Sequence, residues 1–171
     1  ELLLQGLRSS ADEELVRALA RYTVDRFASH TFALYQSHRA FLFVNDIDSA
    51  SRIVPRLLAS DLDEENRVLV QLRQACAEKR LDDASALHLE LQSLDPDNRG
   101  IQALAYSIVG ENTAAEAIFR EFEDKSDFAT LANYLSYPQF DPTPYPKFMQ
   151  RMAGQGIEDR RVRDLPYRCN R

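Results

Sequence analysis

A recurring alanine within helical sequence patterns limits the folds open to this chain more than any other feature. Ala50, Ala84 and Ala115 lie 34 and 31 residues apart, and an apolar residue follows each of them three and seven residues later. The residues at these following positions are Ile53, Leu57, Leu87, Leu91, Ile118 and Phe122. This spacing places them on one face of a helix, and a small residue lets paired helices cross closely. The pattern predicts an all-α fold in which one helix pair recurs.

Start and stop signals divide the chain into further helices. The expected helices span residues 11–28, 31–44, 47–60, 64–79, 82–93, 99–109, 113–124, 127–135 and 144–154. Pro55 predicts a kink, or two shorter helices, because an interior proline removes a backbone hydrogen bond and costs about 3 kcal/mol. The run from Asp95 to Asn98 is expected to stop one helix. Gly110 is expected to end the next in the left-handed conformation.

Prolines interrupt the C-terminal part of the chain. They are Pro138, Pro142, Pro144 and Pro146. No regular helix passes through such a run, so Thr143 and Pro144 are expected to cap and begin the last helix. Residues 157–171 are expected to form a basic tail that lies extended on the body through Leu165 and Tyr167.

Three regions are therefore expected. Residues 1–30 form an N-terminal helix that packs on the array, and residues 31–135 hold the helical repeats. Residues 136–171 contain the Pro-rich loop, the last helix and the basic tail, all packed on the array. The first residue is not methionine, which suggests a fragment of a longer chain.

The composition is typical of a soluble globular protein, with 44% hydrophobic and 28% charged residues. The net charge of −6 argues against nucleic-acid binding, because phosphate contacts need clustered Lys and Arg. No stretch is long enough to insert into a membrane. The compartment stays open: the cytoplasm is favoured, and the periplasm would follow from a preceding signal or membrane anchor.

The cysteines and histidines form no metal-binding pattern. Cys76 and Cys169 lack a CxxC spacing, and Cys76 is expected to be a small buried hydrophobe on the inner face of a helix. A disulfide between them stays open if the compartment is oxidising. His88 is expected to be a packing residue, and nothing in the sequence completes a metal site with His30 and His38.

No catalytic motif is present. The chain has no GxSxG elbow and no Gly-rich phosphate loop, and its five glycines make a backbone-cradled cofactor improbable. We therefore expect no enzymatic activity, no cofactor and no metal. An enzyme domain stays open as an alternative, and a deep polar pocket that joins His38 to a carboxylate would indicate it.

The repeating unit resembles the tetratricopeptide repeat, a helix pair of about 34 residues. Pro96 follows Ala84 by twelve residues, Gly110 precedes Ala115 by five, and Tyr106 stands at the family's tyrosine position. The resemblance covers Thr31 to Asp124. It is partial, because tryptophan is absent and the turn glycine is replaced in two units, by asparagine and by lysine. A related helical repeat, or a degenerate set that ends a larger regulatory or sensor protein, stays open.

The resemblance implies a right-handed stack of antiparallel helix pairs, an α-solenoid, with a Pro-rich C-terminal extension. In the family, first helices line a concave groove that holds extended peptides or partner helices. Carried over, the groove residues are Tyr35, Arg39, Leu42, Phe43, Leu69, Arg73 and Cys76. Arg39 and Arg73 share a register, and paired guanidinium groups suit a carboxylate. The Lys and Asn of the family's carboxylate clamp are not present at these positions, so binding of chaperone tails is not expected.

The sequence therefore predicts a non-enzymatic scaffold that binds a peptide or partner protein through a concave helical groove. The alternative is a regulatory or sensory C-terminal segment of a larger multidomain protein, of the signalling or transcription-regulating kind. The groove hypothesis expects a contiguous exposed patch around Tyr35, Leu42, Phe43 and Arg73. Homo-oligomerisation stays open.

Overall fold

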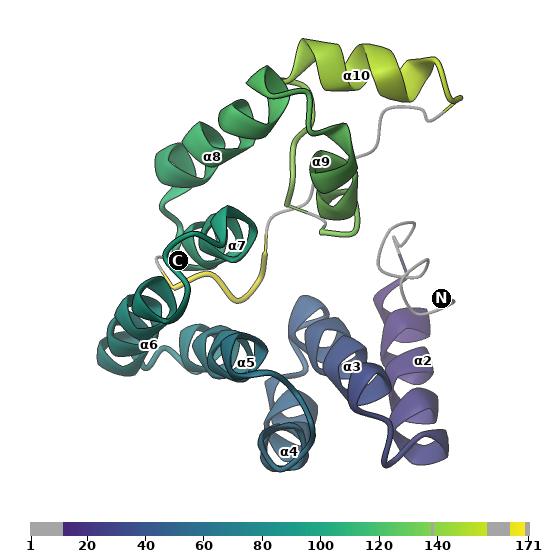
Figure 1. Cartoon of the computed structure of the whole chain (residues 1–171). Coiled ribbons are helices and arrows are strands. Elements are labelled where there is room, and N and C mark those ends of the chain that lie inside the picture. Colours follow the sequence, from purple (N-terminus) through teal and green to yellow (C-terminus); the bar gives the residue numbers. More distant parts are fainter. Residues whose placement is uncertain (1–11, 138, 157–164, 170–171) are drawn as a thin grey trace.

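The computed structural model describes residues 12–137, 139–156 and 165–169, and the regular secondary structure within these ranges is α-helical. The helices follow one another around an arc, with α2 at one end and α10 at the other (Figure 1). They are α2 (Glu13–Arg26), α3 (Thr31–Phe43), α4 (Ile47–Leu58), α5 (Glu64–Ala77), α6 (Leu81–Leu94), α7 (Arg99–Val109), α8 (Asn112–Asp124), α9 (Phe128–Tyr134) and α10 (Pro146–Ala153). None of the helices in these ranges has both the length and the apolar character needed to cross a membrane.

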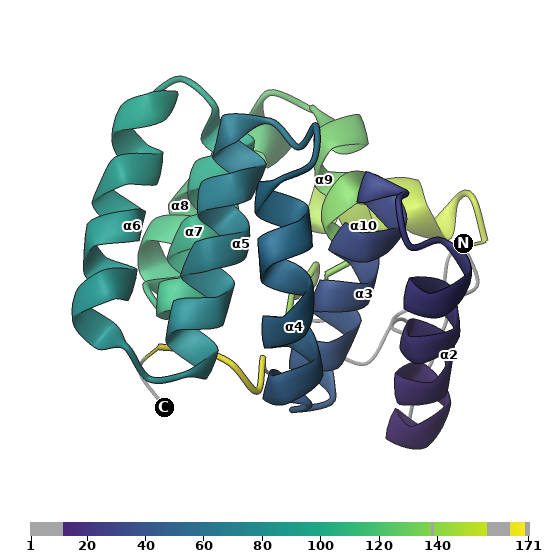
Figure 2. The same cartoon turned by 90° about the horizontal axis from the view of Figure 1, so that it is seen from below.

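Inner and outer helices alternate along the arc. Helices α3, α5 and α7 line its inside, and α4, α6 and α8 lie on its outside (Figure 1). Helix α5 packs against both α3 and α7, while α4 packs against α3 and α5, and α6 against α5 and α7. Figure 2 shows α4, α5 and α6 running side by side. Each of α4 and α6 therefore bridges two inner helices.

The same tight turn ends α3, α5, α7 and α8. Asn45, Lys79, Gly110 and Ser126 have positive φ angles of 55°, 60°, 90° and 57°. In each turn the N–H of the next residue donates to the carbonyl five residues earlier, at 2.8 to 2.9 Å. This is the hydrogen bond of the Schellman motif. Asn45 and Lys79 thus adopt the left-handed conformation that was expected of a glycine.

The alanines that define the sequence period are all buried. Ala50, Ala84 and Ala115 lie on α4, α6 and α8, where each faces a neighbouring helix. His88 is also buried, and its ring meets the ring of Tyr106 edge to face at 5.2 Å. The predicted packing role of His88 is confirmed.

Most of the predicted helix ends lie within two residues of the observed ends. Helix α6 stops at Leu94 and α7 begins at Arg99, which confirms the stop signal between them. Helix α4 runs unbroken past Pro55, so the alternative of two shorter helices is wrong. Pro55 lies in the last turn of α4, and Ser51, whose carbonyl it cannot bond, is exposed and open to water.

The last helix begins at Pro146, two residues later than predicted, and Thr143 lies in the preceding turn rather than at the cap. The buried carboxylate of Glu123 on α8 holds the first turn instead. Its two oxygens accept hydrogen bonds from the backbone N–H groups of Lys147 and Phe148, at 2.6 and 3.0 Å. A negative charge at a helix N-terminus also favours the helix dipole. This contact ties α10 to α8.

The described part of the predicted tail, residues 165–169, lies inside the arc between α5 and α7 (Figure 1). Leu165 and Tyr167 are buried, as predicted. The predicted extended conformation is wrong for these residues, because they form a turn in which the Arg168 N–H donates to the Leu165 carbonyl at 3.4 Å. The N–H of Cys169 donates to the carbonyl of Ile108 on α7 at 3.3 Å. The other predicted tail residues, 157–164, 170 and 171, lie outside the described ranges.

We expect Glu123→Gln to destabilise the protein by roughly 1 to 3 kcal/mol, because a charged acceptor shared by two backbone N–H groups becomes a neutral one. Urea unfolding followed by circular dichroism measures the change. Glu116→Gln is the matched control, since Glu116 is exposed on the same helix. Equal stability of the two variants would show that Glu123 does not hold α10.

Candidate functional site

Two arginines from neighbouring inner helices lie inside the arc. Arg39 on α3 is 6% exposed and Arg73 on α5 is 1% exposed. The guanidinium of Arg39 lies 4.3 Å from the centre of the Tyr137 ring, and its Nη1 donates to Gln36 Oε1 at 3.0 Å. The Nη1 of Arg73 donates to the hydroxyl of Tyr35 at 2.9 Å. We call Arg39 and Arg73 the arginine pair.

No carboxylate of the described residues forms an ion pair with either arginine, although both are charged at any ordinary pH. The Nη2 of Arg73 is buried without a hydrogen-bond partner among these residues. Burying a cation without a counter-ion is costly. Each cation–π contact with a tyrosine ring offsets about 0.5 to 2 kcal/mol of that cost. The pair therefore places two positive charges without a carboxylate partner among the described residues on the inner helices.

His38 lies next to the arginine pair and is completely buried. Its Nε2 lies 3.1 Å from Gln74 Oε1, and Gln74 Nε2 donates to Glu78 Oε1 at 2.7 Å. Burial and then the Arg73 charge lower the pKa of His38 to about 3, although its hydrogen bond to Gln74 acts in the opposite direction. His38 is therefore neutral near pH 7, and Gln74 separates it from the Glu78 carboxylate. The arrangement offers no acid–base pair.

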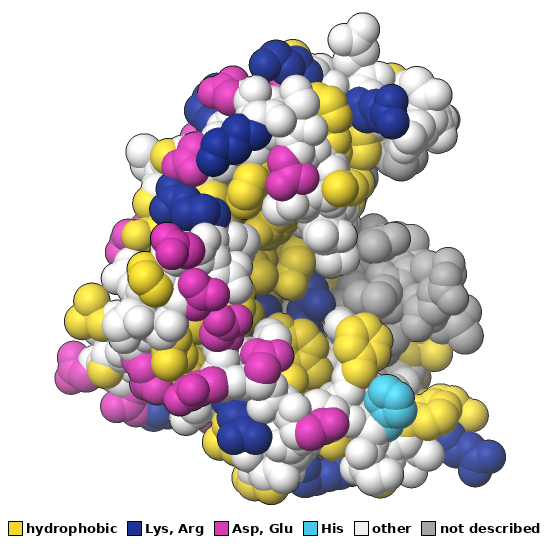
Figure 3. Space-filling model, viewed as in Figure 1, with side chains coloured by type: hydrophobic (Ala, Val, Ile, Leu, Met, Phe, Trp, Pro, Cys, Tyr) yellow, Lys and Arg dark blue, Asp and Glu magenta, His cyan; other side chains and the backbone are white. Residues whose placement is uncertain are grey.

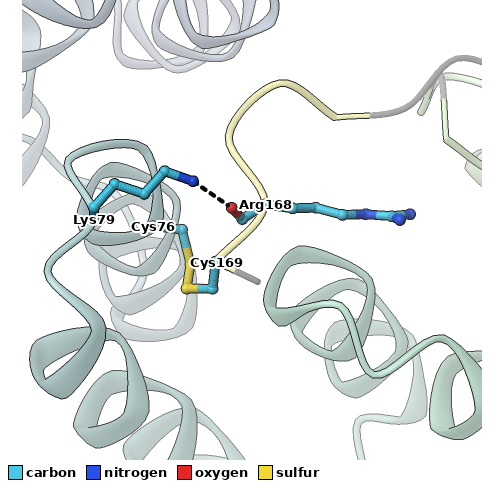
Figure 4. Close-up of a disulfide and its surroundings, with 4 residues drawn as sticks. All are labelled: Cys76, Lys79, Arg168 and Cys169. Atoms are coloured by element: carbon cyan, nitrogen blue, oxygen red, sulfur yellow. Dashed lines mark hydrogen bonds between the residues drawn. A yellow bond between two sulfur atoms is a disulfide. The ribbon is translucent and has the colours of Figure 1, made fainter. Parts of the chain in front are cut away.

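The C-terminal segment covers the arginine pair. Burial raises the pKa of the Tyr167 phenol, while the charges of Arg73 and Arg39 act to lower it, which places this ring within electrostatic range of both. A disulfide joins Cys169 to Cys76 on α5 across a sequence separation of 93 residues. Figure 4 shows the disulfide beside Lys79, whose Nζ donates to the Arg168 carbonyl at 3.2 Å. The sequence left this disulfide open but favoured Cys76 as a small buried hydrophobe. Cys76 is buried, as expected, but it is half of a disulfide and not a free side chain.

Without the disulfide, the free-energy cost of ordering residues 165–169 nearly equals the gain from their contacts. Ordering five residues costs about 5 to 10 kcal/mol of backbone entropy. Burial of Leu165 and Tyr167 returns about 3 to 6 kcal/mol, and the hydrogen bonds to the Leu165, Arg168 and Ile108 carbonyls add about 2 to 4 kcal/mol. A disulfide that closes a loop of this length contributes about 4 to 5 kcal/mol. The covalent bond therefore decides whether the segment stays on the inner face.

The predicted groove residues do not form the exposed patch that the sequence suggested. Six of them, Tyr35, Arg39, Leu42, Phe43, Leu69 and Arg73, are buried, and the seventh, Cys76, is buried in the disulfide. The structure places Arg39 and Arg73 on the neighbouring helices α3 and α5, each against a tyrosine ring. Tyr35, which bonds Arg73, lies on α3, whereas Tyr137 and Tyr167 come from Pro-rich and tail segments whose positions no helical period encodes. A binding role for the six residues stays a prediction, and for the arginine pair it now requires that the tail segment move.

An open cavity lies at the amino-terminal ends of α3 and α5. Its volume is about 770 Å³, and its walls include Phe32, Tyr35, Asp61 and Asn66. Phe32 is 56% exposed, and Asp61 accepts a hydrogen bond from the hydroxyl of Thr31, which lowers the pKa of Asp61. Because Tyr35 also bonds Arg73, the cavity adjoins the arginine pair. Figure 3 shows the molecule hollowed between the α3 and α9 sides, with acidic side chains gathered nearby over α5 and α6.

Comparison with protein-family models, curated proteins and solved structures found no match to this chain.

The low pKa of His38 predicts a specific loss of stability in acid. The unfolded chain protonates near pH 6.5 and the folded one near pH 3, so the His38 contribution is complete above pH 6.5 and is lost as the pH falls toward 3. Between pH 7.5 and 5 the expected loss is about 2 kcal/mol. His38→Gln should lose less stability over this interval by that amount, as measured by urea unfolding. If the free energy of unfolding changes with pH equally in the variant and the wild type, His38 does not titrate in this way.

Proposed function

We propose that this chain is a non-enzymatic scaffold that binds an extended segment of a partner protein on the inside of its arc. The observation that carries the proposal is the position of residues 165–169. They lie there without helical structure, with Leu165 and Tyr167 buried. A face that buries two side chains of one non-helical segment has the space to hold a segment of another protein.

The architecture that suits this role is a right-handed, tetratricopeptide-like stack of antiparallel helix pairs. The recurring left-handed turn and the buried alanines at the sequence period support it. In such a stack the inner helices present one continuous surface, because each outer helix fixes the spacing of the two inner helices that it touches. The inner surface is then the natural place for a ligand.

The cavity beside Phe32 is the proposed entry point for a partner. Its exposed aromatic ring and its carboxylate from Asp61 suit a segment that carries apolar and basic side chains. Tyr35 connects this cavity to the arginine pair. A partner that binds here therefore reaches the face that residues 165–169 occupy.

The disulfide favours a second candidate role, that of a regulatory or sensory segment of a larger protein. A covalent bond between Cys76 and Cys169 that can open gives the inner face two states. It also favours a compartment that oxidises thiols, such as the periplasm, because disulfides persist there.

A peptide library selected on the immobilised chain tests the scaffold proposal. We expect Phe32→Asp to weaken the selected peptides at least tenfold, which is about 1.4 kcal/mol, because a charge replaces the exposed ring of the cavity. Leu89→Asp is the matched control, since Leu89 is 65% exposed on α6 and does not line the cavity. Peptides that bind both variants as tightly as the wild type would contradict the proposed entry point.

A further inference from the structure

Residues 165–169 occupy the inner face as a bound peptide would. Leu165 and Tyr167, two positions apart, are both buried, and the Cys169 N–H donates to the Ile108 carbonyl. The Cys76–Cys169 disulfide fastens the end of the segment to α5 (Figure 4). The part of the chain that covers the arginine pair is therefore also the part that a single reducible bond holds in place.

We propose that the Cys76–Cys169 disulfide is a redox latch over a peptide site. While the latch is closed, the chain's own segment fills the site. Once it opens, the site takes a short segment of another protein that makes the same turn and carries a leucine and a tyrosine two residues apart. This inference rests on the proposed scaffold function and specifies the ligand and the regulation of its inner face.

Opening the latch is a two-electron reduction. A dithiol, such as a thiol-disulfide oxidoreductase, attacks one sulfur of the bond and then resolves the mixed disulfide. The products are the thiols of Cys76 and Cys169 and the oxidised reductant, with two electrons and two protons transferred to the chain. Once the bond is broken, the costs and gains of keeping the segment in place are nearly equal, so a competing segment can displace it.

The socket around Tyr167 explains the choice of ligand. The ring is buried within range of the guanidinium groups of Arg39 and Arg73, and cations favour the face of an aromatic ring. The Nη2 of Arg73 has no acceptor among the described residues, so it can donate to a ligand oxygen. A ligand matches these groups if it places a tyrosine ring at the position of Tyr167 and a backbone or side-chain oxygen near the Nη2 of Arg73.

The test uses a fluorescein-labelled peptide, Leu-Pro-Tyr-Arg-Ser, which copies residues 165–169 with serine in place of cysteine. Fluorescence anisotropy measures its binding to the full chain in three forms: oxidised, reduced with dithiothreitol, and the Leu165→Ser, Tyr167→Ser, Cys169→Ser variant. The variant keeps the inner helices that form the site, but its own tail lacks the two side chains and the cysteine that hold the tail there. We expect the dissociation constant for the variant to be at least tenfold lower than for the oxidised chain, with the reduced chain between them. The control peptide Leu-Pro-Ser-Arg-Ser should not bind.

Equal binding to the oxidised and opened forms, or no binding to either opened form, would overturn the latch. Circular dichroism checks the helix content of the variant, and if that content is lost, the reduced wild-type chain decides the outcome. The scaffold proposal is judged separately, by Phe32-dependent binding of selected peptides to the oxidised chain. If that binding is found and the Leu-Pro-Tyr-Arg-Ser peptide does not bind, the scaffold proposal is supported and the latch proposal is contradicted.

Discussion

Two guanidinium groups that lie inside the arc without a carboxylate among the described residues impose the main physical demand on this structure. Arg39 and Arg73 need an environment that lowers the cost of burying their charges, and the rings of Tyr137 and Tyr35 supply part of it. The tail segment completes the cover. The Pro-rich loop and residues 165–169 are therefore part of how the inner face is stabilised.

The tail segment also determines which parts of the inner face are open to a binding partner. The tail segment beside the arginine pair is a short turn whose own contacts nearly balance the cost of ordering it, so the covalent bond to Cys76 matters most. A scaffold built in this way offers one open entry beside Phe32 and one closed site under Tyr167. Binding at the first needs no rearrangement, whereas binding at the second depends on the state of the disulfide.

Local signals in the sequence predicted the helices well, because caps and turns act within a few residues. Gly110 takes the left-handed conformation, and the run from Asp95 to Asn98 separates two helices, as expected. The start of α10 was wrong because Glu123, 24 residues before Lys147, supplies its cap. The burial of the arginine pair could not be predicted either, since Tyr137 and residues 165–169, which lie close to it, come from segments without a helical period.

The central claim is that folding holds Cys76 and Cys169 together and thereby places the tail segment over the arginine pair. Equilibration of the chain with reduced and oxidised glutathione measures the effective concentration of one thiol at the other, both in native buffer and in denaturant. The account predicts a native value at least tenfold above the denatured value. Equal values would mean that the fold does not bring the two cysteines together, and would contradict the account.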